Sequence, residues 1–207
     1  TYSFLLPANV PGWKTTDSVI ELWQSGFGGV SAYQGEQFAE IDAHILGTLY
    51  QDVSGVAAGS IFAFQFAHRG RSGTDTMRFT ITDLGIDNAL GGSNDTILYS
   101  GTYSDGNQAW GFYTGESAGT LGHTVRFSYE ALSSVGGNSY GNFLDAADFS
   151  VLTEDLTVPE PASLALLGLG LSGIAFSRRR KAEAVERIQY PVLTGYFLVP
   201  GSCTVNR

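Results

Sequence analysis

The sequence has very few of the side chains that carry metal or redox chemistry. Its 207 residues include one cysteine, Cys203, one methionine and three histidines. A single cysteine excludes an intramolecular disulfide framework and a structural zinc site built from cysteines. The sequence also lacks a His-Glu-x-x-His pair of the kind that holds catalytic zinc. From these absences we expect a protein without enzyme activity.

Charged residues are also scarce, and basic ones are outnumbered. The chain has 11 Lys and Arg against 20 Asp and Glu, a formal net charge of −9. Binding to nucleic acid needs clustered basic side chains, so we expect no nucleic-acid partner. The charge is unevenly distributed: residues 1–157 hold 5 basic and 17 acidic side chains, and residues 158–207 hold 6 basic and 3 acidic ones. The chain therefore divides into an acidic first part and a basic end.

Glycine and aromatic residues, in contrast, are plentiful, with 27 glycines and 13% aromatics. Apolar and polar residues alternate over much of residues 1–157, as at Phe62, Phe64 and Phe66, and glycine-rich clusters interrupt the alternation. No amphipathic helical pattern is present before residue 160. The predicted strands are 19–23, 37–45, 48–53, 60–69, 77–82, 96–101, 110–113, 124–129 and 143–152. Eight to ten such strands predict an all-β sandwich of two sheets over residues 1–157.

An uncharged run follows a proline-rich break near the end of the chain. Residues 159–161 read Pro-Glu-Pro, residues 162–176 contain no charge, and residues 178–181 read Arg-Arg-Arg-Lys. As a helix the run is about 22 Å long against a hydrocarbon core of about 30 Å, and arginines that snorkel make up part of the difference. We expect one transmembrane helix at 162–177, with the basic end in the cytoplasm and the acidic domain outside. A soluble core helix and an ordinary tail anchor are the alternatives.

This order of features resembles the PEP-CTERM sorting signal of Gram-negative bacteria. The matching residues are Pro159, Glu160, Pro161, the span 162–176, Arg178, Arg179 and Arg180. The resemblance implies that residues 158–181 are recognised by an exosortase, a separate integral-membrane transpeptidase. It further implies anchoring in the inner membrane in transit, cleavage near the Pro-Glu-Pro triplet, and delivery to the cell surface or the exopolysaccharide matrix.

Both ends of the sequence depart from that family. Members usually stop soon after the arginine cluster, whereas this chain continues over residues 182–207, a tail that we expect to have no function. No charged and apolar leader precedes Thr1, although a protein with this sorting signal must be exported. We therefore expect the true amino terminus and its signal peptide to lie upstream of the sequence.

The acidic domain carries a second resemblance, in the order of its short motifs. These motifs are Val10–Trp13, Ile20–Trp23, Gln37–Ile41, Gly47–Gln51, Phe66–Arg71 and Gly141–Asp145. Together they resemble galactose-binding-like jelly rolls of the carbohydrate-binding-module type. The resemblance implies a jelly-roll sandwich and a polysaccharide ligand, although this fold serves many functions.

Recognition of a sugar needs flat aromatic rings and planar polar groups. The candidate aromatic residues are Trp13, Trp23, Tyr33, Trp110 and Tyr113, and the candidate polar residues are Gln51, His68, Arg69, Arg71 and Asp75. For each aromatic residue, packing in the core or at its rim is the alternative. Arg71 and Asp75 have a further alternative, because an ion pair between them would close a turn in the glycine-rich loop.

Jelly rolls of this type often hold a structural Ca²⁺, which the resemblance makes the candidate metal. The carboxylates near the resembling strands are Glu40, Asp42, Asp145 and Asp148. Asp and Asn residues between 87 and 95 are explained by turn formation without a metal.

Taken together, these patterns predict an exported, non-enzymatic surface or matrix protein that binds polysaccharide. A structural matrix component without a specific glycan site is the first alternative. A surface hydrolase is the second.

Overall fold

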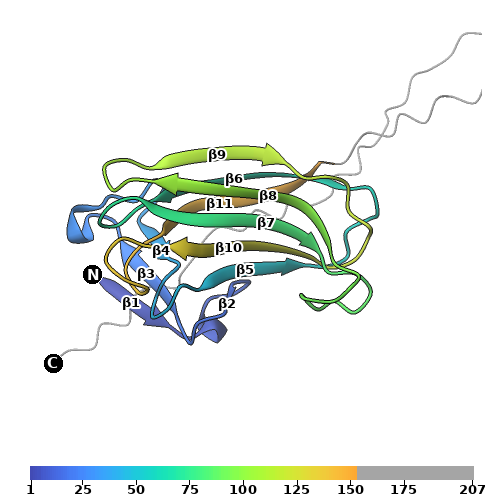
Figure 1. Ribbon diagram of the computed structural model, residues 1–207, viewed down its shortest axis with the longest axis horizontal. Helices are drawn as coiled ribbons and strands as arrows, with labels where there is room; N and C mark the ends of the chain where they lie inside the picture. Colours follow the sequence, from blue (N-terminus) through green and yellow to red (C-terminus); the bar gives the residue numbers. More distant parts are fainter. Residues whose placement is uncertain (153–207) are drawn as a thin grey trace, which may run out of the picture. The chain divides into compact units, whose positions relative to one another are not determined.

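A computed structural model describes residues 1–152 of the chain. They form two β-sheets (Figure 1). The strands are β1 (Tyr2–Leu5), β2 (Lys14–Thr15), β3 (Ile20–Gln24), β4 (Gln37–Glu40), β5 (Thr48–Val53), β6 (Ile61–Arg69), β7 (Asp75–Asp83), β8 (Thr96–Asp105), β9 (Gly111–Glu116), β10 (Val125–Ser133) and β11 (Phe143–Leu152). Two short 3₁₀ helices, η1 (Pro7–Asn9) and η2 (Phe27–Gly29), lie between strands. The predicted helix at 162–177 and the tail 182–207 lie outside the described residues.

One sheet has six strands in the order β1-β3-β4-β11-β6-β9, and the other has five in the order β2-β5-β10-β7-β8. The prediction of an all-β sandwich of two sheets is confirmed. The predicted strand at 37–45 is too long, because pairing of β4 ends at Glu40. Strands β1 and β2 were not predicted: they are only four and two residues long, too short for a pattern of alternation.

The main core lies where the alternation places it, between the two sheets. Phe64 and Phe66 of β6 contact Phe79 of β7, Phe66 also contacts Tyr129 of β10, and Phe62 contacts Phe127 of β10. All six side chains are buried. Rings of Phe64 and Phe79 lie 4.8 Å apart, and those of Phe66 and Phe79 lie 5.0 Å apart. These tilted ring contacts add to the burial of apolar area. Because the inward positions are aromatic, the intervening residues of the same strands must face outward.

A smaller core lies on the outer side of the six-stranded sheet. It contains Trp23, Val30, Phe38 and Phe143, with Trp110 packed against it. Trp13 belongs to the main core instead. Trp13 and Trp23 are 7% and 4% exposed, so these two aromatic residues pack in the core, the alternative that the sequence left open.

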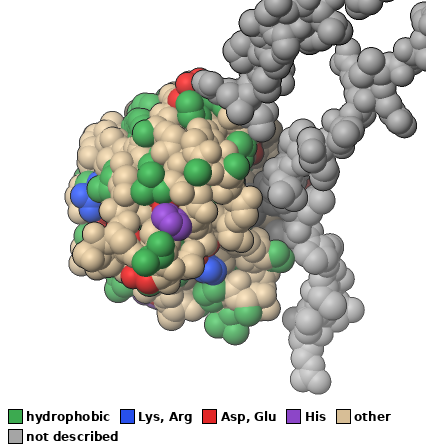
Figure 2. All heavy atoms as spheres, turned by 90° about the vertical axis from the view of Figure 1, so that its right-hand side faces the viewer, with side chains coloured by type: hydrophobic (Ala, Val, Ile, Leu, Met, Phe, Trp, Pro, Cys, Tyr) green, Lys and Arg blue, Asp and Glu red, His purple; other side chains and the backbone are tan. Residues whose placement is uncertain are grey.

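In the part of the chain that the structure describes, no helix is both long and apolar enough to cross a bilayer. Figure 2 looks onto the right-hand end of Figure 1, where the visible hydrophobic side chains are scattered among polar atoms. This end of the sandwich therefore presents no single apolar patch in that view.

Gly70 directly follows β6, at a point where three backbone segments meet. A Cβ added there would clash with the Gly73 carbonyl oxygen and lie 2.7 Å from the Asp105 carbonyl oxygen. Neither atom is on a flexible side chain, so the backbone itself would have to move. Any larger residue at this position would therefore displace the start of the β6–β7 turn.

We expect Gly70→Ala to lower the free energy of unfolding by about 1–3 kcal/mol, because overpacking against backbone cannot be relieved by a rotamer change. Chemical denaturation measures the effect. Gly106→Ala is the matched control, since nothing lies within 4 Å of its added Cβ. Equal stability of the two variants would contradict this account of Gly70.

Candidate functional site

Motifs far apart in the sequence meet at the end of the sandwich where β4 ends, β6 turns into β7 and β11 begins. Glu40 ends β4 and Asp42 follows it, Arg71 lies in the β6–β7 turn, Asp75 begins β7, and Asn142 precedes β11. Glu40, Asp42, Asp75 and Asn142 have no exposed surface. We call these five residues the carboxylate cluster. The structure thus brings together four of the candidate site residues.

Arg71 supplies the positive charge of the carboxylate cluster. Its Nη1 donates to both oxygens of Glu40, at 3.0 and 3.1 Å. The guanidinium also lies over two rings, with Cζ 3.5 Å from the centroid of Tyr140 and 4.6 Å from that of Trp23. Stacking and pairing together fix the guanidinium in one orientation.

Asp75 joins two loops through backbone groups. Its oxygens accept from the N–H of Arg71 at 2.9 Å, of Val135 at 2.6 Å and of Asn142 at 3.1 Å. The sequence left open an ion pair between Arg71 and Asp75 that would close the turn. The two residues do contact each other across the turn, but not through an ion pair. Arg71 binds Asp75 with its backbone, while its side chain pairs with Glu40.

Asp42 is the least compensated carboxyl group of the carboxylate cluster. Its Oδ2 accepts from the Ser134 hydroxyl and from Asn142 Nδ2, whereas Oδ1 has no hydrogen-bond partner within residues 1–152. Burial raises the pKa of Asp42 to about 7. Burial, with the nearby carboxyl of Glu21, also raises the pKa of Glu40 to about 8, against the opposing effects of Arg71 and the Gly141 N–H.

His68 connects the carboxylate cluster to Asp105, a carboxylate outside the cluster. Its Nε2 faces Asn142 Oδ1 at 3.0 Å and its Nδ1 faces Asp105 Oδ2 at 2.7 Å. The Tyr113 hydroxyl donates to Asp105 Oδ1 at 2.8 Å. His68 has no exposed surface, so its ring makes structural hydrogen bonds in the interior and cannot reach a polymeric substrate.

The remaining candidate residues lie apart from the carboxylate cluster. The Arg69 guanidinium donates to the Asn107 carbonyl oxygen. Trp110 donates from Nε1 to the Ser31 carbonyl oxygen at 2.9 Å. Gln51 lies in β5 of the five-stranded sheet. The structure therefore does not gather the seven candidate ligand-binding residues on one surface.

The four candidate Ca²⁺ ligands do not converge either. Asp145 Oδ2 accepts from the N–H groups of Tyr33 and Gln34, at 2.7 and 3.0 Å, and Asp148 is exposed. Both oxygens of Glu40 already face the Arg71 guanidinium. Within residues 1–152, no three acidic, His or Cys side chains are arranged to hold a metal. Arg71 provides the charge that a cation would otherwise supply to Glu40, so these residues do not fit a shared Ca²⁺ site.

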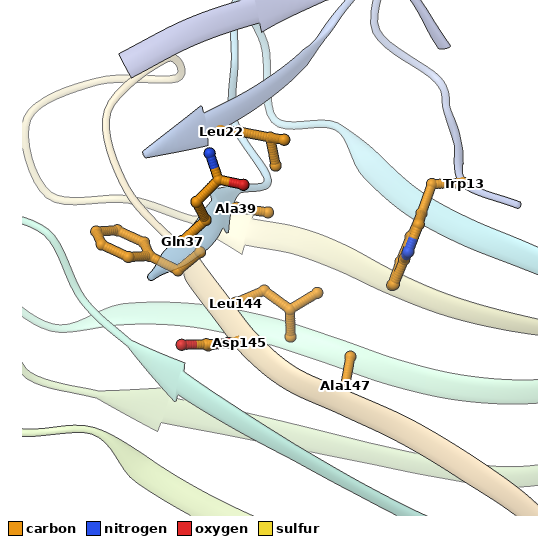
Figure 3. A pocket seen from close by; sticks show the side chains of 8 residues that line it. Trp13, Leu22, Gln37, Ala39, Leu144, Asp145 and Ala147 are labelled. Carbon is orange, nitrogen blue, oxygen red and sulfur yellow. The ribbon is translucent and has the colours of Figure 1, made fainter. Parts of the chain in front are cut away.

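A small pocket opens where β11 leaves β4. The two strands pair only at Phe143 and Leu144, after which β11 continues along β6 alone. Figure 3 shows the lining side chains, which come from β3, β4, β11 and the segment before β2. Its volume of about 20 Å³ has room for a water molecule and not for a sugar ring.

The sequence also contains the spacing of a serine nucleophile, although we expect a protein without enzyme activity. Gly115, Ser117 and Gly119 follow the Gly-x-Ser-x-Gly pattern at the end of β9. The pattern is catalytic when a strand turns sharply into a helix and exposes the serine. Here no helix follows in the described residues, and the buried Ser117 hydroxyl donates to Ala118 O and accepts from the Phe62 N–H. Ser117 is therefore a structural residue.

The outer face of the five-stranded sheet carries a polar array that the sequence did not predict. Asp52 of β5 accepts from Arg126 of β10 at 2.7 and 3.0 Å and from Lys14 of β2 at 2.8 Å. The Arg126 Cζ lies 4.1 Å from the ring centroid of Tyr50. Partial burial of Asp52 would raise its pKa, but the bonds from Arg126 and Lys14 hold it below the usual range. We call Lys14, Tyr50, Asp52 and Arg126 the Tyr50 array.

The strand register extends this array across the whole sheet. Lys14, Tyr50, Ser128, Thr80 and Ser100 lie opposite one another in one row over all five strands. At about 4.8 Å per strand, the row is about 19 Å long. The neighbouring rows carry long paired side chains, Asp52 with Arg126 on one side and Glu130 with Arg78 on the other. Short hydroxyl side chains thus lie between two rows of charged ones. Two features of the sequence could have predicted this polar face. One is the alternation in β10, and the other is that three of the five basic residues of 1–157, Lys14, Arg78 and Arg126, fall on these strands.

The comparisons with known proteins agree with both parts of the chain. Residues 157–181 match the PEP-CTERM protein-sorting motif. This motif indicates a secreted protein that is anchored in the membrane in transit and then exported to the cell surface. No curated protein sequence matches the chain.

Solved carbohydrate-binding modules share the fold. The CBM22-1 xylan-binding domain of Paenibacillus barcinonensis Xyn10C is 13% identical, with a TM-score of 0.52 over 69% of this chain and 87% of that domain. The CBM22-2 xylan-binding domain of the same protein is 11% identical, with a TM-score of 0.50 over 72% and 97%. The CBM22-1–GH10 modules of Clostridium thermocellum Xyn10B, complexed with xylohexaose, are 10% identical, with a TM-score of 0.50 over 73% and 29%. The fold is that of a carbohydrate-binding-module jelly roll.

The buried Asp42 makes stability depend on pH. Its pKa of about 7 in the folded protein exceeds its ordinary value of 3.8, so folding favours the protonated form. The contribution is complete below about pH 4 and is lost as pH rises through 7. We expect the folded domain to lose about 2–4 kcal/mol between pH 5 and pH 8 through this group.

Asp42→Asn cannot ionise and should make the fall in melting temperature between pH 5 and pH 8 shallower, leaving the part that Glu40 contributes through its own raised pKa. Thermal denaturation followed by circular dichroism at several pH values measures it. Asp148→Asn, at an exposed position, is the control that should keep the wild-type slope. A wild-type melting temperature that stays constant or rises over this range would contradict the assignment.

Proposed function

We propose that this protein is a non-catalytic surface protein that binds polysaccharide through the outer face of its five-stranded sheet. The Tyr50 array is the observation that carries the proposal. A sugar ring presents C–H groups to an aromatic ring and hydroxyls to planar polar groups. In this array the Arg126 guanidinium lies over one face of the Tyr50 ring and pairs with the Asp52 carboxylate, so the three side chains fix one another. Little side-chain entropy remains to be lost on binding.

The row of Tyr50, Ser128, Thr80 and Ser100 supports a polymeric ligand. An extended polysaccharide laid across the strands would meet the Tyr50 ring at one end and the hydroxyl groups of Ser128, Thr80 and Ser100 over the remaining length of about 14 Å. One neighbouring module is a xylan-binding domain, and another was solved in complex with xylohexaose. They support a polysaccharide as the class of ligand for this chain.

The proposal assigns no catalytic role. His68 and Ser117 are buried and engaged in structural hydrogen bonds. The proposal also contains no structural Ca²⁺, because Arg71 engages Glu40 and the other candidate carboxylates lie elsewhere. Among the candidate residues, His68, Arg71 and Asp75 maintain the interior in this proposal. A matrix component without a glycan site would also have no catalytic role and no structural Ca²⁺. It would differ from the proposed protein only in not binding polysaccharide.

Sorting by an exosortase is the second part of the proposal. Residues 157–181 carry the sorting motif, and the exported domain would reach the cell surface after processing at Pro159, Glu160 and Pro161. The uncharged run and the arginines at 178–180 would hold the chain in the inner membrane until then.

We expect Tyr50→Ala to weaken binding to soluble xylan, measured by affinity electrophoresis, by about tenfold or more, a loss of about 1.4 kcal/mol. Tyr50→Phe retains the ring and should lose less than threefold. Tyr2→Ala removes a ring from the other sheet that is 46% exposed, more accessible than the half-buried Tyr50, and is the control. A glycan array covers ligands other than xylan.

Two results would contradict this proposal. If the wild-type chain binds no glycan on the array, the matrix component without a glycan site is the better description. If the Tyr50→Ala and Tyr2→Ala variants bind equally well, the ligand does not contact the Tyr50 array.

We expect replacement of Pro159, Glu160 and Pro161 by alanines to leave the chain uncut in the membrane fraction. The wild-type chain should lose its carboxyl-terminal segment and reach the surface in cells with an exosortase. Immunoblotting of membrane and surface fractions measures both. Cleavage of the alanine variant at the wild-type rate would contradict recognition through this triplet.

A further inference from the structure

A pair of exposed rings lies on the outer face of the six-stranded sheet, on the opposite side of the sandwich from the Tyr50 array. Tyr33 and Phe112 are 44% and 43% exposed. Their centroids are 5.1 Å apart and their planes differ by 9°. At this separation two parallel rings are offset-stacked, so each keeps ring surface open to solvent.

The pair is held in place from two sides. The Tyr33 and Gln34 N–H groups donate to Asp145 of β11, at 2.7 and 3.0 Å. Trp110, which directly precedes β9, donates to the carbonyl oxygen of Ser31 at 2.9 Å. The loop that carries Tyr33 is therefore tied to both flanking segments. The rings are oriented in advance, which lowers the entropy cost of binding a ligand.

A strained bulge in β11 shapes the surface beside the rings. Asp145 lies opposite Ala67 of β6, but the next outward pair is Asp148 with Gln65, so β11 contains one extra residue. Ala146 adopts a φ of 48° within this bulge. A non-glycine residue in the left-handed region costs about 1–2 kcal/mol. The result is that the carboxylate of Asp148 lies on the outer face at a position where regular pairing would place Ala147.

The register brings polar groups next to the rings. Phe112 lies opposite Ala67, and in the adjacent row Thr114 and Asp148 lie on either side of Gln65. Ala67 presents only a methyl group between Phe112 and Asp145. An aromatic surface, a hydroxyl, an amide and a carboxylate thus share one face. We call Tyr33, Gln65, Phe112, Thr114 and Asp148 the Phe112 platform.

We propose that the Phe112 platform is a second polysaccharide site, which lets one chain bridge two glycan strands. Its chemistry is that of a sugar site, with ring surface for C–H groups and short polar groups for hydroxyls. The charged groups on this face of β11, β6 and β9 are Asp145, Asp148, Glu116 and Arg69, and the Arg69 guanidinium is engaged by the Asn107 carbonyl oxygen. Three carboxylates against one guanidinium leave the face acidic. The carboxylates repel an anionic polymer and another copy of this acidic chain, and they accept hydrogen bonds from a neutral glycan.

This inference rests on the proposed function and extends it from one site to two. The two sites lie on outer faces of different sheets, so one glycan strand bound flat on one sheet leaves the other site free. Bridging of separate strands raises the avidity of a matrix without any new contact.

The test uses the full chain in detergent and beads coated with xylan or with neutral β-1,3-glucan. The wild-type chain should bind the beads and clump them. Phe112→Ala and Tyr33→Ala should bind through the Tyr50 array but need at least tenfold more protein to clump beads. Tyr50→Ala should also lose clumping and keep residual binding, which disappears when Phe112→Ala is added. Ile86→Ala, at a loop position 80% exposed, is the control and should behave as wild type.

The outcomes separate the two proposals. Clumping by Phe112→Ala at the wild-type protein concentration would overturn the second site and leave the first intact. Complete loss of binding in Tyr50→Ala alone would likewise overturn the second site and leave the Tyr50 array intact. Full binding by Tyr50→Ala together with complete loss in Phe112→Ala would refute the Tyr50 array and retain the Phe112 platform. If the wild-type chain binds neither coating, both proposals are wrong for neutral glycans.

Discussion

Burial of aromatic side chains between the two sheets determines which residues of this domain can meet a ligand. Phe62, Phe64 and Phe66 occupy the inward positions of β6, and Phe127 and Tyr129 those of β10. Since side chains alternate along a strand, every residue between them faces away from the core. The strand residues of the Tyr50 array and of the Phe112 platform all take such outward positions, and only Tyr33 comes from a loop. A shift of one residue in register would bury the charged rows and expose the rings of the core.

The carboxylate cluster has a different task, which is to close one end of the sandwich. Asp75 accepts three backbone N–H groups from two loops, and Arg71 pairs with Glu40 between two aromatic rings. A buried ion pair gains little net stability, because both groups lose their hydration. Its directed bonds nevertheless hold the β6–β7 turn and the segment before β11 in one arrangement. The residues that look most like catalytic groups in the sequence therefore belong to the interior.

Much of the fold could be predicted because alternation is a local signal. The bounds of β5 and β11 match the prediction, and the outward position of Arg126 follows from the alternation of Val125, Phe127 and Tyr129. Pairings between distant segments have no such signal. Glu40 and Arg71 are 31 residues apart, and nothing in the sequence of the glycine-rich turn shows that the guanidinium pairs with Glu40 and not with Asp75. The bulge at Ala146 was also invisible, because Asp-Ala-Ala-Asp fits a regular strand equally well.

Hydroxyl-radical footprinting of the chain with and without soluble xylan tests the central claim most directly. It reports which side chains lose solvent contact when the polymer is present. The account predicts lower oxidation of Tyr50 with unchanged oxidation of Tyr2, which lies on the edge strand of the other sheet. Equal oxidation of Tyr50 with and without xylan, under conditions where the chain is bound, would contradict it.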